Sequence, residues 1–194
     1  KKYKNFKSRI KNSYLKSEIN DENMSYVFTL SKIFRISRNS LVKSLRSFKG
    51  LPHRYEIFLR KKNFVFINDS KATSFEATKY ALKNTKNIHW IVGGLPKKND
   101  KISLKNFKKN ILKTYIIGKD INFFKKQINT KTKYKVTRDI KNSLIEILKN
   151  AKYSSKKISI LFSPAAASFD QYLNFEKRGD QFKKLSRIYA RKYI

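Results

Sequence analysis

The sequence predicts an α/β domain with a mostly parallel sheet and flanking helices. Short runs of β-branched and aromatic residues alternate with longer segments whose apolar residues have helical spacing. Hydrophobic residues make up 40% of the 194 residues and aromatic residues 14%, which is enough to fill a core. Strands that alternate with helices pair mostly in parallel, because each crossover helix returns the chain to the same end of the sheet.

The first 50 residues are expected to be helical rather than α/β. Residues 1–19 are basic and show no clear period, whereas residues 20–35 and 39–48 each have apolar residues at nearly helical spacing. In the first helix these residues are Met24, Val27, Phe28, Leu30 and Ile33. Gly50 is expected to end the second helix, so we predict two parts, residues 1–50 and residues 51–194.

Strands and helices are predicted to alternate from residue 51 onward. The strands are assigned to short aromatic and β-branched runs, and the helices to the amphipathic segments between them. A turn at residues 60–63 joins the first two strands. The predicted strands are residues 55–59, 64–67, 88–92, 115–117, 134–136 and 158–162. The predicted helices are residues 73–82, 104–112, 120–128, 139–149 and 175–193.

Ligands on open α/β sheets bind beyond the carboxyl ends of the strands, which selects three loops: residues 68–73, 93–98 and 163–175. In the first loop, Lys71 can bind a phosphate or carboxylate and Asp69 can accept a hydrogen bond from a sugar hydroxyl. The same loop also fits a plain helix cap with one exposed lysine. From the spacing alone, both interpretations remain open.

The other two loops carry weaker signals. Gly93-Gly94 permits a tight turn and close approach of a ligand, with Lys97 or Lys98 nearby, but it lacks P-loop spacing. Residues 163–170 are small and polar, so Ser168 and free backbone N–H groups can bind a carboxylate at a helix start. A turn after a strand explains either loop equally well.

Several classes of site are excluded or disfavoured. The chain has no Cys, which excludes disulfides, thiolate metal sites and a cysteine nucleophile. His89 lies within a predicted strand and is interpreted as structural, and no His, Asp or Glu cluster has metal-ligand spacing. No apolar run is long enough to span a membrane, and the amino terminus does not read as a secretory signal.

The net charge of +34 allows two interpretations. A surface this basic attracts nucleic acid, and a basic nucleic-acid-binding module is the alternative function. However, the positive charges are mostly Lys, are spread along the chain and accompany abundant Asn and Ile. This pattern also fits the codon bias of an A/T-rich genome. The only Met is Met24 and the sequence begins at Lys1, so we expect it to start inside a longer protein.

The loops and their surroundings together resemble the Mur ligases, enzymes of bacterial cell-wall synthesis. The resemblance covers about residues 20–194, and its last block is typical of the branch that adds D-glutamate. At Ile19 the sequence departs from the family, which usually has His there. The blocks that carry the resemblance are Leu51-Pro52-His53-Arg54, Asn68–Thr73, Gly93-Gly94 with Lys97, Ser163–Gln171, Asn174-Phe175-Glu176 and Arg178-Gly179.

The resemblance implies a carboxy-terminal Rossmann-like domain, residues 51–194, preceded by the helical end of a central ATP-binding domain. It implies a cytoplasmic ligase that uses ATP and Mg²⁺ to join D-glutamate to UDP-N-acetylmuramoyl-L-alanine through an acyl phosphate. The family's P-loop, carbamylated lysine and metal ligands are expected upstream of this sequence. Without the amino-terminal domain and most of the central domain, the chain is expected to be inactive.

The resemblance also implies roles for individual residues. Lys71 is expected to be catalytic, near the phosphates and the reacting carboxylate. The expected ATP-binding residues are Asn23 on the adenine, Arg54, and Asp69 on the ribose. The expected D-glutamate-binding residues are Thr73, Lys97 and Ser168, together with Phe169 and Phe175 through their backbone. No metal ligand is expected in this chain.

Overall fold

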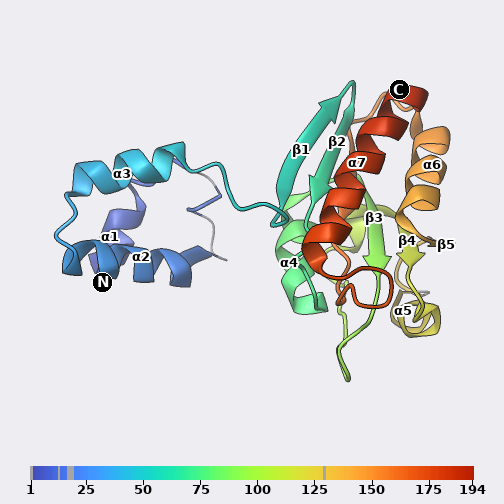
Figure 1. Cartoon of the computed structure of the whole chain (residues 1–194), viewed down its shortest axis with the longest axis horizontal. Helices are drawn as coiled ribbons and strands as arrows, with labels where there is room; N and C mark the ends of the chain where they lie inside the picture. The colour runs from blue at the N-terminus through green and yellow to red at the C-terminus, as the bar shows by residue number, and fades with distance from the viewer. Residues whose placement is uncertain (1, 13, 17–19, 129) are drawn as a thin grey trace. The chain divides into compact units, whose positions relative to one another are not determined.

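The chain forms two compact units, Lys1–Gly50 and Leu51–Ile194, shown in the computed structural model of Figure 1. The structure describes residues 2–12, 14–16, 20–128 and 130–194. Among these residues, no helix combines the length and the apolar character needed to cross a membrane.

The described residues of the first unit form the helices α1 (Lys2–Lys7), α2 (Asp21–Ile33) and α3 (Arg38–Ser47). The two predicted helices are confirmed, whereas α1 was missed because six residues are too few to show a period. The predicted apolar stripe of α2 is correct in part. Met24 and Phe28 are buried with α1 and α3, but Val27, Leu30 and Ile33 are exposed.

The second unit contains a six-stranded sheet in the order β1-β2-β6-β3-β4-β5. The strands are β1 (Glu56–Lys61), β2 (Phe64–Asn68), β3 (Ile88–Gly93), β4 (Ile111–Ile117), β5 (Tyr134–Arg138) and β6 (Ile158–Phe162). Only the pairing of β1 with β2, across a tight turn at Lys62 and Asn63, is antiparallel. The predicted fold class is therefore confirmed.

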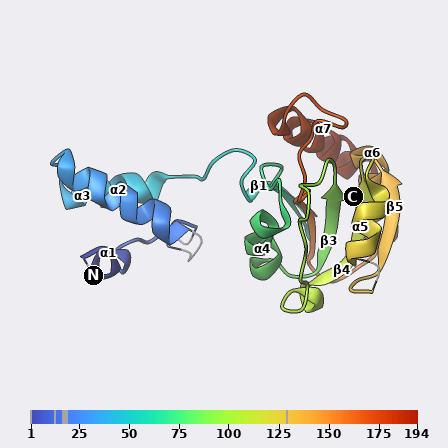
Figure 2. The same cartoon turned by 90° about the horizontal axis from the view of Figure 1, so that it is seen from below.

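Helices cover both faces of this sheet, as Figure 2 shows. The helices are α4 (Phe75–Asn84), α5 (Ile121–Ile128), α6 (Ile140–Ala151) and α7 (Phe175–Tyr193). Successive side chains of a strand point to opposite faces. Thus Phe64 and Phe66 of β2 pack with α6 and α7, whereas Val65 and Ile67 pack with α4 and α5. The sheet is the middle layer of three.

The predicted helix at residues 104–112 is wrong. The chain instead makes a turn and a short 3₁₀ helix, η2 (Lys108–Asn110), and β4 then begins at Ile111. Leu104 and Phe107 have helical spacing because both enter the core from this turn. The Asn110 side chain donates a hydrogen bond to the Leu82 carbonyl (2.8 Å), and Ile111 pairs with β3. These tertiary contacts outweigh the local preference for helix.

Candidate active site at the carboxyl ends of the strands

The three loops selected from the sequence lie side by side, because β2, β6 and β3 are adjacent and parallel. Backbone hydrogen bonds join them directly. The Asp69 N–H donates to the Phe162 carbonyl (2.8 Å), and the Gly93 N–H donates to the Pro164 carbonyl (2.9 Å). Leu95 and Ala167 exchange two hydrogen bonds of 2.9 Å. Residues from three separate segments therefore form one continuous edge.

Asp69 is held rigidly at the end of β2. Its Oδ1 accepts the Tyr55 N–H (3.0 Å), and its Oδ2 accepts the Ser163 hydroxyl (2.6 Å). Burial raises the pKa of this carboxyl to about 7, although the hydrogen bonds from Ser163 and Tyr55 and the charge of Arg54 partly oppose the rise. Asp69 is thus a fixed acceptor whose charge depends on pH near neutrality.

Lys71 lies against Phe175, the first residue of α7. Its ammonium is 3.9 Å from the centre of the Phe175 ring, a cation–π contact that directs an otherwise mobile side chain. The Lys71 N–H donates to the His53 carbonyl (3.0 Å), and the Ser70 hydroxyl donates to the Phe175 carbonyl (2.8 Å). Two of the predicted site residues, Lys71 and Phe175, are therefore in direct contact.

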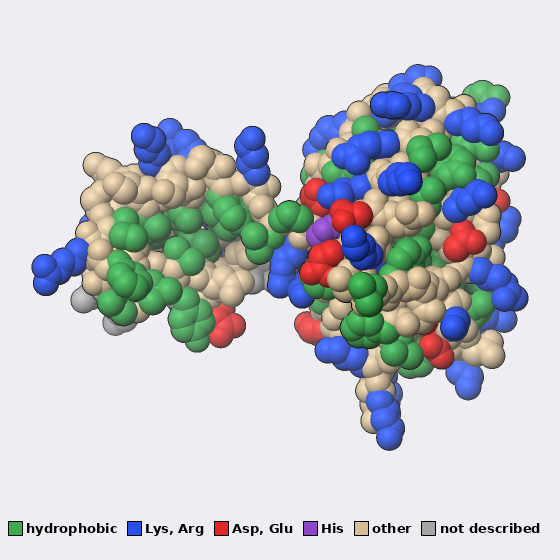
Figure 3. All heavy atoms as spheres, in the orientation of Figure 1, with side chains coloured by type: hydrophobic (Ala, Val, Ile, Leu, Met, Phe, Trp, Pro, Cys, Tyr) green, Lys and Arg blue, Asp and Glu red, His purple; other side chains and the backbone are tan. Residues whose placement is uncertain are grey.

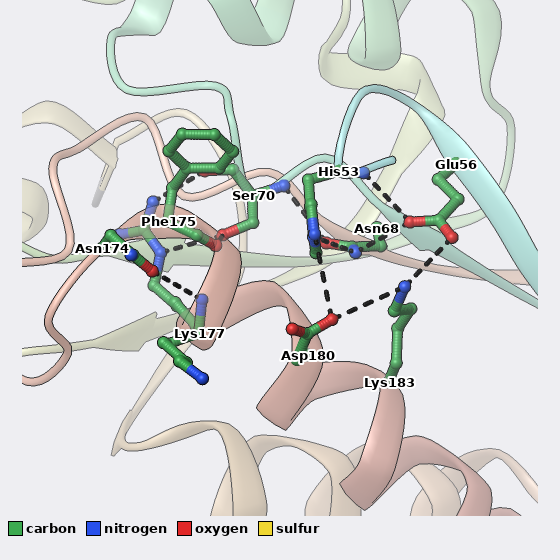
Figure 4. Close-up of polar contacts among 10 residues, drawn as sticks. His53, Glu56, Asn68, Ser70, Asn174, Phe175, Lys177, Asp180 and Lys183 are labelled. Carbon is green, nitrogen blue, oxygen red and sulfur yellow. Dashed lines mark hydrogen bonds and ion pairs between the residues drawn. The ribbon is translucent and has the colours of Figure 1, made fainter. Parts of the chain in front are cut away.

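His53 is the centre of a polar network that holds the same loop, shown in Figure 4. The Asn68 Oδ1 accepts the Ser70 N–H (3.2 Å), so the Asn68 amide nitrogen faces His53 Nδ1 at 3.0 Å. Because that nitrogen can only donate, His53 Nδ1 accepts. The neutral ring then carries its proton on Nε2, which lies 3.8 Å from Asp180.

Glu56 closes this network. Its Oε2 accepts hydrogen bonds from the His53 N–H (3.0 Å) and from the Asn68 amide (3.1 Å). Its Oε1 pairs with Lys183 of α7 at 3.2 Å. Burial raises the Glu56 pKa, but the hydrogen bond from the His53 N–H and the contacts with Lys183 and Asn68 outweigh burial and lower it. The network therefore joins β1, β2 and α7 (Figure 4).

The glycine pair serves protein contacts rather than an open ligand approach. A Cβ at Gly93 would lie 2.0 Å from the Ile117 carbonyl oxygen, and one at Gly94 would lie 2.4 Å from the Ala167 carbonyl oxygen. Both glycines also have φ above +130°. What approaches each glycine is backbone of the same domain: the end of β4 at Gly93 and the loop at Ala167 at Gly94.

The amino end of α4 is capped differently from the expectation. Ser74, outside the 68–73 loop, accepts the Ala77 N–H (3.3 Å). Asp100 reaches back from the segment after the glycine pair and accepts the Phe75 N–H (2.8 Å). A carboxylate of the protein thus already occupies this helix end, and nothing in the local pattern had indicated Asp100.

The remaining predicted residues of this unit are near the loops but less connected. Ser168 is buried and precedes a turn rather than a helix, since its carbonyl accepts the Gln171 and Tyr172 N–H groups. In the part of the chain that the structure describes, its hydroxyl has no hydrogen-bond partner. Among the described residues, the side chains of Thr73, Lys97 and Phe169 make no hydrogen bond or ion pair with another predicted site residue, and Phe169 is 70% exposed. Arg54 acts on Asp69 through its charge alone.

Asn23 lies in α2 of the first unit, so the second unit does not contain it. Ile19, the departure from the family pattern, lies outside the described residues. Among the residues that are described, no group of three or more His, Asp or Glu side chains is placed to hold a metal ion.

His89 is a core residue, as expected: it is buried in β3, and its Nδ1 lies 3.0 Å from the Tyr115 hydroxyl.

Arg178 has no role in the sequence-based prediction, although it lies in a motif block. Its guanidinium is buried among all three loops and donates to the Ser70 hydroxyl, the Ser70 carbonyl and the Ala166 carbonyl. Helical periodicity places it on the inner face of α7. Only the tertiary structure shows that its partners come from two strand-end loops.

The basic surface shows no single focus on the faces visible in Figure 3, where Lys and Arg side chains are spread over both units. Nucleic-acid sites usually gather cations in a stripe or patch. No such stripe or patch is seen on the face that Figure 3 shows.

Comparison with known proteins identifies relatives by sequence. The chain is 36% identical over 166 residues to the UDP-N-acetylmuramoylalanine–D-glutamate ligase of Wolbachia sp. subsp. Brugia malayi, covering 86% of this chain and 33% of that protein. It is 40% identical over 148 residues to the enzyme of the same name from Rhizobium meliloti, covering 76% and 32%. The chain thus spans about a third of the length of these relatives. No family model matches it.

Comparison with solved structures finds a similar fold. A crystal structure of MurF from Acinetobacter baumannii superposes with a TM-score of 0.60, covering 90% of this chain and 38% of that one. The sequence identity is 14%, so this likeness concerns the fold alone.

Proposed function

Because this chain belongs to the Mur ligase family and corresponds to the carboxy-terminal part of such an enzyme, we propose that it forms one side of the active site of a UDP-N-acetylmuramoyl-L-alanine:D-glutamate ligase. The observation that carries the proposal is the strand-end edge itself. It brings the directed cation of Lys71, the fixed carboxyl of Asp69 and the unpartnered hydroxyl of Ser168 onto two neighbouring loops.

The complete reaction joins two anions, which explains the need for cations. ATP converts the carboxylate of UDP-N-acetylmuramoyl-L-alanine into an acyl phosphate, the amine of D-glutamate attacks the acyl carbon, and phosphate leaves. Lys71 neutralises charge near the transferring phosphoryl group and the reacting carboxylate. Its contact with Phe175 limits the positions that the ammonium samples, so less order has to be gained on substrate binding.

The nucleotide is assigned to the β2 side of the edge. Arg54 faces solvent next to Asp69 and supplies a charge for phosphate. Each carboxylate oxygen of Asp69 has one internal partner and retains a second lone pair, so it can still accept a ribose hydroxyl. Asn23 is assigned to the adenine, and residues 1–50 to the end of the central ATP-binding domain.

D-Glutamate is assigned to the β3 and β6 side. Lys97 is exposed and supplies the cation, and Thr73 and Ser168 supply hydroxyl donors. The backbone at Phe169 and Phe175 completes the carboxylate contacts. Because Leu95 pairs with Ala167, Lys97 and Ser168 project from loops that are already joined.

The described residues do not form a Mg²⁺ site of their own. Mg²⁺ prefers octahedral oxygen ligands, and no cluster of acidic side chains is present in the described part of the chain. The metal ligands are therefore assigned to the rest of the ligase, as is the P-loop, and the 194-residue chain alone is expected to be inactive.

The experiment is a phosphate-release assay on the complete ligase that contains this chain. Phosphate is expected only when ATP, Mg²⁺, UDP-N-acetylmuramoyl-L-alanine and D-glutamate are all present. Release that does not depend on D-glutamate, or that occurs equally with L-glutamate, contradicts the proposal. The isolated chain serves as the inactive control.

A further inference from the structure

Arg178 is a buried cation without an ion-pair partner among the described residues. Its relative exposure is 1%, and no carboxylate lies within salt-bridge distance of it. Burial lowers its pKa from 12.5 to about 10, so the guanidinium stays charged at neutral pH. Its Nη1 is buried with no hydrogen-bond partner. An unpaired buried charge is costly, which raises the question of what Arg178 does there.

The three donated hydrogen bonds of Arg178 reach two different loops. Its Nε donates to the Ser70 hydroxyl (3.1 Å), and its Nη2 donates to the Ser70 carbonyl (2.9 Å) and the Ala166 carbonyl (2.9 Å). Ser70 lies between Asp69 and Lys71, and Ala166 lies two residues before Ser168. One guanidinium thus joins the loop assigned to the nucleotide and the loop assigned to D-glutamate.

The free edge of the guanidinium lies at the third loop. A Cβ at Gly94 would lie 3.1 Å from Nη1, so Arg178 also borders the glycine pair that precedes Lys97. The rigid planar fork of Arg can hold three acceptors at once, whereas a Lys ammonium has no such fixed geometry. The positive charge that remains unpaired at this edge favours the binding of anions.

We propose that Arg178 is a positioning residue of the ligase: it sets the separation between Lys71 and Ser168, and its unpaired charge helps the site to accept the anionic amino-acid substrate. This proposal rests on the proposed function. It differs from a purely structural role, because the acceptors of Arg178 are backbone and hydroxyl groups of ligand-facing loops, while α7 packs on the sheet through other residues such as Phe182.

Amide hydrogen exchange on the 194-residue chain tests the positioning role without any substrate. The variants are Arg178→Lys, which keeps the charge and loses the fork, and Lys177→Gln, a matched control on the exposed side of α7. We expect Arg178→Lys to speed exchange of the Ala72 and Ala167 amides about tenfold, with Val92 and Ile160 in the central strands unchanged. Equal acceleration in the strands, or none in the loops, overturns the proposal.

Steady-state kinetics of the complete ligase test the link to the substrate. Arg178→Lys and Arg178→Gln are expected to raise the KM for D-glutamate about tenfold, with the larger rise in the Gln variant, while the KM for UDP-N-acetylmuramoyl-L-alanine stays within about twofold. A merely structural defect reduces the amount of folded enzyme, so it lowers kcat and leaves every KM unchanged. That outcome overturns the proposal. If the wild-type ligase shows no D-glutamate-dependent phosphate release, the proposed function is contradicted. The hydrogen-exchange result does not depend on that function, so it still tests the positioning role of Arg178.

Discussion

The Ser163 hydroxyl donates a 2.6 Å hydrogen bond to the carboxyl of Asp69, although the two residues are 94 positions apart. Asp69 follows β2 and Ser163 follows β6, and these strands are parallel neighbours. The hydrogen bond therefore fixes the ends of two strands at the point where the candidate active site begins. Burial is the main cause of the raised pKa of Asp69, and the hydrogen bond from Ser163 partly opposes this rise.

Replacing Asp69 with Asn should change how stability depends on pH. The carboxyl has a pKa of about 7 when folded and about 3.8 as a free side chain. The folded state binds the proton more tightly, so the contribution of this group is largest below pH 3.8 and is lost as the pH rises through 7. Asn cannot ionise, so the stability of the variant relative to wild type should increase from pH 4 to pH 8.

Urea denaturation at several pH values in this range measures the effect of Asp69→Asn. Glu76→Gln is the control, because Glu76 is an acidic residue on the exposed side of α4. A difference between Asp69→Asn and wild type that does not vary with pH would mean that the buried carboxyl is already ionised at pH 4.

His89 should make the protein sensitive to mild acid. Burial and the charge of Lys113 lower its pKa from 6.5 to about 4. The unfolded state then binds the proton more tightly, so stability is lost as the pH falls from about 6.5 to about 4. His89→Gln keeps a polar partner for Tyr115 and should flatten the stability curve in this window. An unchanged slope between pH 6.5 and pH 4 in thermal unfolding contradicts this assignment.

Gly179→Ala should destabilise the protein, although Ala is normally favoured over Gly inside a helix by about 1 kcal/mol. A Cβ at this position would lie 2.2 Å from His53 Nδ1 and 3.1 Å from the Asn68 amide nitrogen. The variant must therefore displace His53 from its hydrogen bond with Asn68. Lys184→Ala, on the exposed side of the same helix, is the control and should be neutral. A melting temperature at or above that of wild type would show that the His53 network yields without cost.

Lys71→Met should lower kcat of the complete ligase by roughly 100-fold or more, because it removes a charge that acts on the transferring phosphoryl group. Phe175→Leu should have a smaller effect, since it removes only the ring that directs the Lys71 ammonium. Lys119→Met, an exposed lysine beyond β4, is the control and should behave as wild type. Equal losses in Lys71→Met and Lys119→Met would exclude a specific role for Lys71.

The charge of +34 predicts weak RNA binding by the isolated chain. This binding should disappear as the salt concentration rises, because contacts between Lys and phosphate gain their free energy from the release of counterions. Filter binding at low and physiological salt checks this. Tight, sequence-specific binding at physiological salt would instead favour the nucleic-acid-binding alternative.

The sequence by itself determined the order of strands and helices and which loops follow the strands. The last helix, residues 175–193, and the buried strand at 158–162 were predicted with the observed bounds, because apolar periodicity and capping residues such as Asn174 act locally. The motif blocks also carried the resemblance to the Mur ligases. Local signals were misleading at residues 104–112, where distant contacts prevailed and Asn110 binds the end of α4.

Only the tertiary structure decided which side chains meet at the site. The contacts of Lys71 with Phe175, of Asp69 with Ser163, and of Arg178 with Ser70 and Ala166 each join segments far apart in the chain. The apolar periodicity of the sequence does not predict such pairs, because they depend on the position of β6 between β2 and β3. The strand order is set by burying apolar area on both faces of the sheet at once, which is a property of the whole domain and of no single segment.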